Sequence, residues 1–274
     1  MLNLSVCSDV AERSSRKGEE PVRGDIKLVR FIEELAANSW PSYIQQTLGE
    51  WRLRANMNVT KRANSVYTCG SIPEYGQWME VVEEFYRQRS LLPCFYIGEA
   101  SPAELDGSLH SSGYRKIFEC YTMVASCIEV LAASAQSDQF TTEFAAEASS
   151  EWIYDFMRLE GYSPARYDGY VHIFSAIGPK KSFVNLCDNG KLIALGTVVT
   201  ERGWAGLSNI VVDAEHRGKG AAAALLRVLA GWALCNGADQ LYLQVLKDNL
   251  PAISLYRKHG FTSLSEHHYR LLDT

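Results

Sequence analysis

The sequence has no long apolar run and no large excess of charge of either sign. Its longest apolar stretches, at residues 192–199 and 221–226, fall far short of the roughly 20 residues that a membrane-spanning helix needs. The 27 basic and 32 acidic residues give a formal net charge of −5. Because no global positive field is present to attract a polyanion, we expect neither a membrane segment nor a nucleic-acid partner.

The sequence also lacks the cysteine patterns of metal-binding and disulfide-rich proteins. Its seven cysteines are an odd number, are scattered, and never form Cys-x-x-Cys, which indicates neither a zinc ribbon nor a disulfide framework. His267 and His268 are adjacent near the C-terminus, but neighbouring residues on a strand point to opposite faces. We expect no metal site.

A secretory signal is not recognisable either. The first residues, MLNLSVCSDVAERSSRKGEE, place acidic groups after a very short apolar run, unlike the long apolar core of an export signal. Together with the cysteine usage, this predicts a cytoplasmic protein.

The composition is that of an ordinary globular protein. The chain has 274 residues, of which 47% are hydrophobic and 22% charged, and its length allows about two domains at roughly 150 residues each. Residues 1–25, rich in Ser, Glu, Arg and Lys without periodicity, predict a poorly ordered lead-in. The Ala- and Ser-rich residues 126–139 predict a junction or connecting helix, so we place the domains at 26–137 and 138–274.

The hydrophobic periodicity predicts alternating helices and strands in both halves. In the first half we expect helices at residues 25–38, 73–88 and 102–110, and strands at 51–56, 65–69, 94–97 and 114–124. In the second half we expect helices at 141–159, 165–177, 220–235 and 250–259, and strands at 183–187, 192–200, 204–212, 240–246 and 261–272. The similar element order favours a diverged internal repeat, although any helix that ends in glycine before an apolar strand gives a similar pattern.

A turn between the strand at 204–212 and the helix at 220–235 has the chemistry of a phosphate site. Gly218 and Gly220 allow a close backbone approach, Arg217 and Lys219 add positive charge, and the first amides of the helix point outward with the helix dipole behind them. The spacing excludes a P-loop, because Gly220 follows Lys219. A dinucleotide fingerprint is closer, but too little chain follows for a Rossmann half-domain. A plain surface turn remains the other alternative.

A second motif lies one strand further on. The string NLPAISLYRKHGF at residues 249–261, taken with RGKGAA at 217–222, resembles the two signatures of the GNAT N-acetyltransferase superfamily. The first signature is an acetyl-CoA loop of the form Arg/Gln-x-x-Gly-x-Gly/Ala, and the second is a helix of the form Asn-x-x-Ala-x-x-Leu-Tyr-x-x-x-Gly-Phe. The resemblance covers about residues 141–272, while residues 51–55 and 59–66 look like tandem members with a degenerate first half.

The resemblance implies an α/β (α+β, GNAT-like) fold of two GNAT-like mixed β-sheet units flanked by helices, the C-terminal one complete. The first half enters its helix through CGSIPEY at residues 69–75, without a glycine pair or a basic residue. We therefore expect one acetyl-CoA per chain as co-substrate. Because the two halves can bury their faces against each other, we also expect a monomer or loose homodimer.

The resemblance also assigns roles to individual residues. The backbone of Ile210, Val211 and Val212 would pair with pantetheine, Asn249 would hydrogen-bond it, and the pyrophosphate would lie on Arg217, Gly218, Lys219, Gly220, Ala221 and Ala222. Tyr256 would face the sulfur and protonate the leaving thiolate, since a phenol of pKa ~10 suits a thiol of pKa about 8.5 or higher. A core aromatic is the alternative for Tyr256.

The general base and the acceptor cleft are less well defined. The strand at 204–212 has no Asp or Glu before Asp213, which leaves Glu119, Glu201 and Glu215 as candidates that would equally suit a solvated surface. The acceptor cleft would be walled by the first half, with Trp51, Arg54, Arg62 and Asn64 as lining residues, unless they only form ordinary hairpin pairs.

The predicted function is transfer of an acetyl group from acetyl-CoA directly to a primary amine, most simply that of a small molecule, although a protein or peptide amine also fits. The alternative is a catalytically silent CoA-binding regulatory or scaffold protein.

Overall fold

The computed structural model describes residues 25–74, 76–134 and 139–272. The predicted lead-in, apart from Asp25, and the predicted boundary at 137/138 lie outside these residues. No helix in the described ranges has the length and apolar character needed to cross a membrane.

Both halves alternate strands and helices, as predicted. The first half contains α1 (Ile26–Asn38), β1 (Ile44–Leu48), β2 (Trp51–Ala55), β3 (Val66–Tyr67), α2 (Trp78–Arg87), β4 (Cys94–Gly98), α3 (Leu105–Ser111), β5 (Tyr114–Ser126) and α4 (Cys127–Ala133). The second half contains β6 (Thr141–Ala145), α5 (Ser150–Glu160), α6 (Tyr167–Ser175), β7 (Lys180–Asp188), β8 (Lys191–Glu201), β9 (Trp204–Val212), α7 (Ala221–Cys235), β10 (Gln240–Leu246), α8 (Leu250–Lys258) and β11 (Thr262–Leu272).

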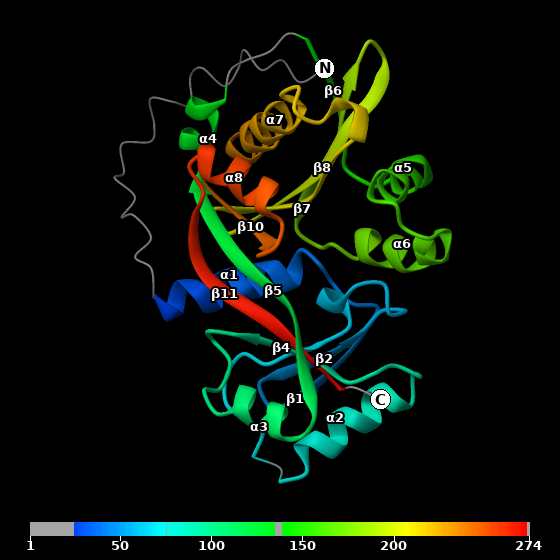
Figure 1. The fold of residues 1–274 in the computed structure, drawn as a ribbon, viewed down its shortest axis with the longest axis vertical. Coiled ribbons are helices and arrows are strands. Elements are labelled where there is room, and N and C mark those ends of the chain that lie inside the picture. Colours follow the sequence, from blue (N-terminus) through cyan, green and yellow to red (C-terminus); the bar gives the residue numbers. More distant parts are fainter. Residues whose placement is uncertain (1–24, 75, 135–138, 273–274) are drawn as a thin grey trace.

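The strands of both halves form one mixed sheet. Its 11 strands follow the order β1-β2-β3-β4-β11-β5-β10-β9-β8-β7-β6, which confirms the predicted α/β class of mixed sheet flanked by helices. The long strands β5 and β11 cross from one half to the other and run side by side through the middle of the molecule (Figure 1). Because β5 pairs with both β10 and β11, the second half takes one strand of its sheet from the first half.

Two short strands differ from the sequence-based expectation. Residues 141–145 form the edge strand β6, paired antiparallel with β7, where we expected the start of a helix. The helix α5 begins only at Ser150, because the Ser149 hydroxyl accepts a hydrogen bond from the Trp152 amide at 3.1 Å and caps it. The strand β1, which forms a hairpin with β2, was not predicted.

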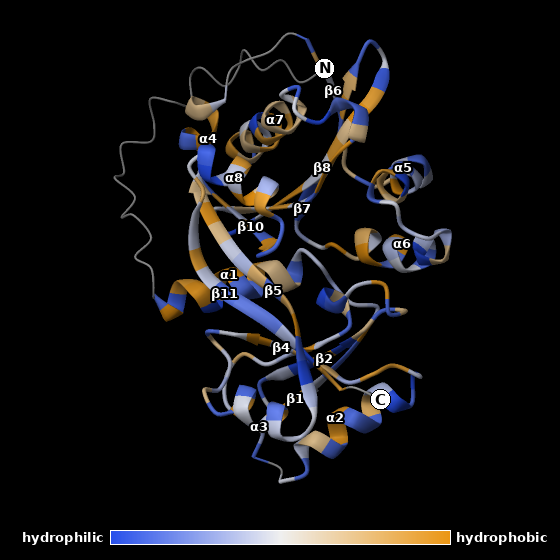
Figure 2. Ribbon diagram, viewed as in Figure 1, coloured by the Kyte–Doolittle hydropathy of each residue, from blue (hydrophilic) through white to orange (hydrophobic). Residues whose placement is uncertain are grey.

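Asp188, Asn189 and Gly190 form the hairpin turn between β7 and β8. Asn189 and Gly190 both have positive φ, at 49° and 78°, as the tight turn between β7 and β8 requires. In Figure 2, β8 is largely in the colour of hydrophobic residues, and its residues Ile193 to Thr200 are all buried.

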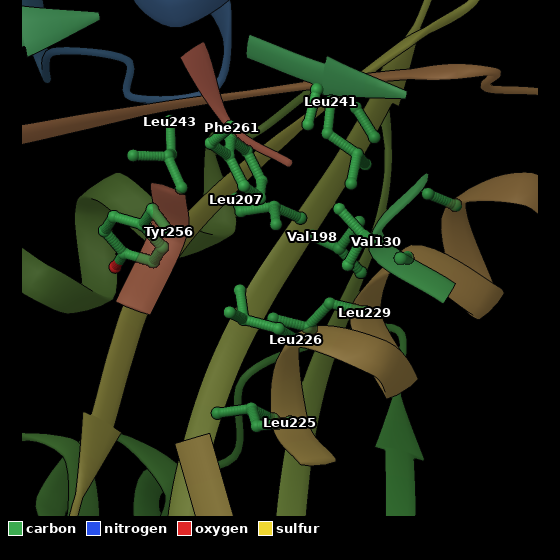
Figure 3. Packing of buried hydrophobic residues seen from close by; sticks show 14 of the residues in the cluster. Val130, Val198, Leu207, Leu225, Leu226, Leu229, Leu241, Leu243, Tyr256 and Phe261 are labelled. Atoms are coloured by element: carbon green, nitrogen blue, oxygen red, sulfur yellow. The ribbon is translucent and has the colours of Figure 1, made fainter. Parts of the chain in front are cut away.

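The second half of the sheet is covered on both faces. Helix α7 packs Leu225, Leu226 and Leu229 against Val198 and Leu207 (Figure 3). Helices α5 and α6 cover the opposite face, where their aromatic residues meet Leu195, Val199 and Val211. Because side chains alternate along β8, this strand contributes to the hydrophobic cores on both faces of the sheet. It also supports the adjacent strand β9, with which it pairs.

Candidate active site

The parallel strands β9 and β10 separate half-way along their length. They pair only from Gln240↔Trp204 to Leu243↔Leu207, although β9 continues to Val212 and β10 to Leu246. The pairing of β9 with β8 shifts register between Leu195 and Thr197, and Asn209 has a φ of +55°. This bulge turns β9 away from β10, so the facing peptide groups beyond Leu207 do not pair with each other.

A cavity of about 280 Å³ opens where the two strands separate. Ser208 and Ile210 of β9 line it on one side, and Gln244 of β10 lines it on the other. Asn249 and Tyr256 contribute to it from α8. The structure therefore brings the predicted residues Ile210, Asn249 and Tyr256 together around one space.

Tyr256 has a buried ring and a hydroxyl that reaches the cavity. The side chain is 8% exposed, and its ring contacts Phe261 at 5.7 Å between centroids. Figure 3 shows the hydroxyl oxygen directed away from the hydrophobic cluster, and no described residue forms a hydrogen bond with it. Burial, together with the charge of Glu160, raises the pKa of Tyr256 to about 12, so the phenol keeps its proton at neutral pH.

Asn249 already has one role in the fold. Its Oδ1 accepts a hydrogen bond from the Ala252 amide at 3.3 Å and caps α8. The cap fixes the side chain at the cavity wall, and leaves the carboxamide nitrogen as the group that could donate to a bound ligand.

The glycine turn before α7 has the open conformation that the phosphate interpretation requires. Gly218 and Gly220 have φ of +73° and +87°, and nothing lies within 4 Å of a Cβ placed on either one. Helix α7 begins without a side-chain cap, as α2, α3 and α6 also do. Residues 217–220 are exposed, so the first amides of a 15-residue helix are accessible to an anion.

Other residues predicted for the cofactor take different positions around this turn. Arg217 donates from Nε to the Val212 carbonyl at 3.2 Å, which ties the turn to the end of β9. Ala221 is 1% exposed, so its methyl group packs in the core and only its backbone amide could contact the cofactor. Val211 is buried under α5 and α6, and Ala222 is half-buried.

None of the three predicted candidates for the base lines the cavity. Glu119 pairs with Lys116 and Lys247, Glu201 accepts hydrogen bonds from Asn38, and Glu215 lies 3.6 Å from Lys191. These ion pairs and hydrogen bonds are those of surface carboxylates, which is the alternative that the sequence left open.

Glu160, at the last turn of α5, lines the cavity instead. Burial raises the pKa of its carboxyl group, while the charge of Arg217 and a hydrogen bond with Tyr162 oppose the shift. Sequence reasoning missed it, because a glutamate before the C-terminal Gly161 of an amphipathic helix has no local signature of function.

Of the four predicted acceptor-cleft residues, Arg62 lines the cavity and the other three do not. Trp51 is fully buried against Trp78 and Phe95. Arg54 donates to the Ser65 carbonyl, and Asn64 bonds the backbone of Asn56. Their role is to stabilise the first half, as in the hairpin alternative.

The adjacent histidines point to opposite sides, as strand alternation predicts. His267 lines the cavity and stacks on Tyr96 at 4.9 Å between centroids, and burial lowers its pKa to about 3. His268 instead bonds Asp106 at 2.7 Å. In the part of the chain that the structure describes, no group of three His, Cys, Asp or Glu side chains could hold a metal ion.

The family model described as "Probable histone acetyltransferase Rv0428c C-terminal" matches residues 27–272. The chain belongs to the GNAT N-acetyltransferase superfamily. It is 50% identical over 243 residues to the uncharacterized N-acetyltransferase YobR of Bacillus subtilis, which covers 89% of this chain and 98% of that protein. A streptothricin acetyltransferase of Escherichia coli is 41% identical over 58 residues, 21% of this chain and 33% of that protein.

Solved structures of GNAT proteins share the fold over nearly the whole chain. A GCN5-related N-acetyltransferase from Kribbella flavida has a TM-score of 0.68 at 14% identity, covering 91% of this chain and 95% of its own. A tandem GNAT protein from the clavulanic acid biosynthesis pathway has a TM-score of 0.63 at 12% identity, covering 99% and 94%. The predicted GNAT membership and acyltransferase class are confirmed, and the tandem fold is shared.

Proposed function

We propose that this GNAT protein transfers an acetyl group from acetyl-CoA directly to the primary amine of a small molecule. One observation carries the proposal: β9 separates from β10 beside Tyr256, and the end of β9 is tied by the hydrogen bond from Arg217 to the Val212 carbonyl to the uncapped start of α7. These features match the three chemical parts of the donor, which are the extended pantetheine arm, the thioester and the pyrophosphate.

The open strand edge supports binding of an extended amide-containing chain. Beyond Leu207, the peptide groups of β9 no longer pair with β10, and unpaired strand edges readily accept another extended chain. In this proposal the pantetheine arm pairs with the backbone of Ile210 to Val212, and the pyrophosphate lies on the amides of residues 218–222.

The reaction forms a C–N bond and breaks the C–S bond of the thioester. The amine attacks the carbonyl carbon and loses a proton, and the departing thiolate takes a proton from the Tyr256 hydroxyl. Burial raises the pKa of the Tyr256 hydroxyl to about 12, so the phenol holds its proton until the thiolate departs.

The attacking amine must be neutral. For a lysine-like amine of pKa ~10.4, loss of the proton at neutral pH costs roughly 4–5 kcal/mol. In our proposal Glu160 accepts this proton, directly or through one water. It lines the same cavity as Tyr256, and its charge acts on the Tyr256 hydroxyl.

The test is release of free CoA thiol from acetyl-CoA with a panel of primary amines. We expect acceptor-dependent release with at least one class of small amine. Tight acetyl-CoA binding without thiol release across the whole panel would favour the silent CoA-binding protein instead.

One chain supplies every element of the cavity described above, so we propose that a monomer or loose homodimer suffices. We also propose that the protein acts in the cytoplasm.

The number of cofactor sites follows from the asymmetry of the two halves. The first helix after residues 69–74, α2, is not preceded by a pair of glycines with basic neighbours, whereas α7 is. Isothermal titration calorimetry should therefore give one acetyl-CoA per chain. Two equivalent sites would contradict the assignment of the cofactor to the second half alone.

Replacing Gly220 by Val should raise the Kd for acetyl-CoA at least about tenfold, because a branched side chain would stand where the pyrophosphate approaches the amides. The matched control is Gly190→Val. Gly190 has a similar positive φ and the same open surroundings, so both variants carry the same backbone strain of roughly 1–2 kcal/mol. Equal Kd values for the two variants, measured by calorimetry, would show that the turn before α7 does not contact the cofactor.

A further inference from the structure

Arg62 places a positive charge at the cavity wall without an ion-pair partner among the described residues. Its side chain lines the cavity and is half-buried. Within the described ranges, no carboxylate lies in ion-pair distance of it and no hydrogen bond involves its guanidinium. Its one close partner is an aromatic ring, since the guanidinium carbon lies 4.2 Å from the centroid of Trp40.

The stacking partner of Arg62 is itself fixed. Trp40 is 2% exposed, and its Nε1 donates to the Thr60 hydroxyl at 3.0 Å. The same hydroxyl accepts a hydrogen bond from the Ala63 amide and so caps the short turn that carries Arg62. The guanidinium therefore lies in a prepared position, with its planar set of five donors unused.

Other buried arginines of the chain have partners. Arg54 donates to the Ser65 carbonyl and hydroxyl, and Arg270 forms a bidentate pair with Asp106. These side chains stabilise the fold. Arg62 differs from them because it faces an open cavity.

Arg62 is also separate from the cofactor turn. Arg62 lies between β2 and β3 and lines the cavity, whereas Arg217 donates to the Val212 carbonyl at the end of β9 and does not line it. The two cations therefore lie on different halves of the molecule. In the proposed function, Arg217 belongs to the turn that binds the pyrophosphate. Arg62 therefore lies in the part of the cavity that is left for the acceptor amine.

Glu33 does not neutralise Arg62. Both residues line a narrow side cavity of about 10 Å³, but they form no ion pair. Burial raises the pKa of Glu33 to about 7, which is opposite to the effect of a nearby paired cation.

We propose that the acceptor amine also carries a carboxylate, and that Arg62 binds this carboxylate through its planar guanidinium. The proposal rests on the proposed acetyl transfer and names its substrate class: a small amino carboxylate. A guanidinium and a carboxylate match as two parallel hydrogen bonds, which would hold the amine at a fixed distance from the thioester.

The test compares matched acceptors in which a neutral carboxamide of similar shape replaces the carboxylate: β-alanine with β-alaninamide, and 4-aminobutyrate with 4-aminobutanamide. For at least one pair we expect kcat/KM to favour the carboxylate by about 10- to 100-fold, the range of a hydrogen bond to a charged group. Arg62→Met should abolish this preference through a higher KM for the carboxylate, and Arg62→Lys should restore part of it. Arg52→Met is the control, because Arg52 stacks on Tyr67 outside the cavity and should keep the preference.

A binding measurement separates this proposal from the proposed function. Calorimetric titration of the amino carboxylates into the chain saturated with CoA should show binding that Arg62→Met removes and Arg52→Met keeps, whether or not acetyl transfer occurs. Equal turnover of carboxylates and amides, with Arg62→Met unchanged, would overturn the carboxylate site while leaving acetyl transfer intact. A preference for aminoalkyl phosphonates over both would also overturn it, in favour of a phosphate-bearing amine.

Discussion

Replacing Tyr256 by Phe is expected to lower kcat about 100-fold, while the KM for acetyl-CoA changes less than about threefold. The substitution keeps the ring that contacts Phe261 and removes the hydroxyl, which no described residue uses as a hydrogen-bond partner. Loss of general-acid catalysis costs about 10²-fold or more, and a group that acts only in the transition state changes kcat rather than binding.

The measurement is steady-state kinetics with saturating amine, combined with a pre-steady-state experiment to confirm that chemistry limits the rate. Tyr154→Phe is the control, because Tyr154 is 56% exposed and stacks on Tyr167 at the surface. If Tyr256→Phe kept the wild-type kcat under these conditions, Tyr256 would be a packing residue and another proton donor would have to be sought.

Replacing Glu33 by Gln is expected to stabilise the protein at pH 8 by about 3 kcal/mol. Glu33 is 3% exposed, and burial raises the pKa of its carboxyl from an ordinary 4.5 to about 7. Each pKa unit corresponds to 1.36 kcal/mol. The native state therefore binds the proton more tightly than the unfolded state, and stability falls as the pH rises from about 4.5 to 7.

The difference in the free energy of unfolding between Glu33→Gln and wild type should be near zero at pH 4 and reach its full size above pH 7. Chemical denaturation at a series of pH values measures it. Glu34→Gln is the matched control, since Glu34 lies next in the sequence but pairs with Arg202 at the surface. A constant difference across the pH range would mean that the carboxyl of Glu33 titrates normally.

Local signals in the sequence predicted much of this fold. The strands β7 to β11 and the helices α7 and α8 lie where periodicity placed them, because each has an apolar pattern bounded by turn residues. The short strands β1 and β6 were missed. Each has five residues at a sheet edge, where the exposed face gives little hydrophobic pattern.

The crossing of β5 and β11 between the halves could not be read from the sequence. Strand pairing joins residues such as Tyr114 and Leu272, and no local pattern specifies which distant strand is the partner. The same holds for the candidate site. Tyr256 and Asn249 were predicted because one continuous motif contains them, whereas Trp40, Glu160 and His267 meet in the cavity only through the tertiary fold.

For a polar residue of the first half, the sequence left two alternatives. Arg54 was a candidate for the acceptor cleft because the first half was expected to wall that cleft, and an ordinary hairpin residue was the other possibility. The structure shows that its donors bond Ser65 and that it is 3% exposed. Such local hydrogen bonding is invisible in the sequence, since it depends on which strand lies alongside.

The most direct test of the central claim is a crystal structure of this chain with acetyl-CoA bound. It should show the pantetheine arm between β9 and β10, paired with the backbone of Ile210 to Val212, and the thioester sulfur within hydrogen-bonding reach of the Tyr256 hydroxyl. A pantetheine arm outside the space between these strands, or a sulfur on the far side of the cavity from Tyr256, would contradict it.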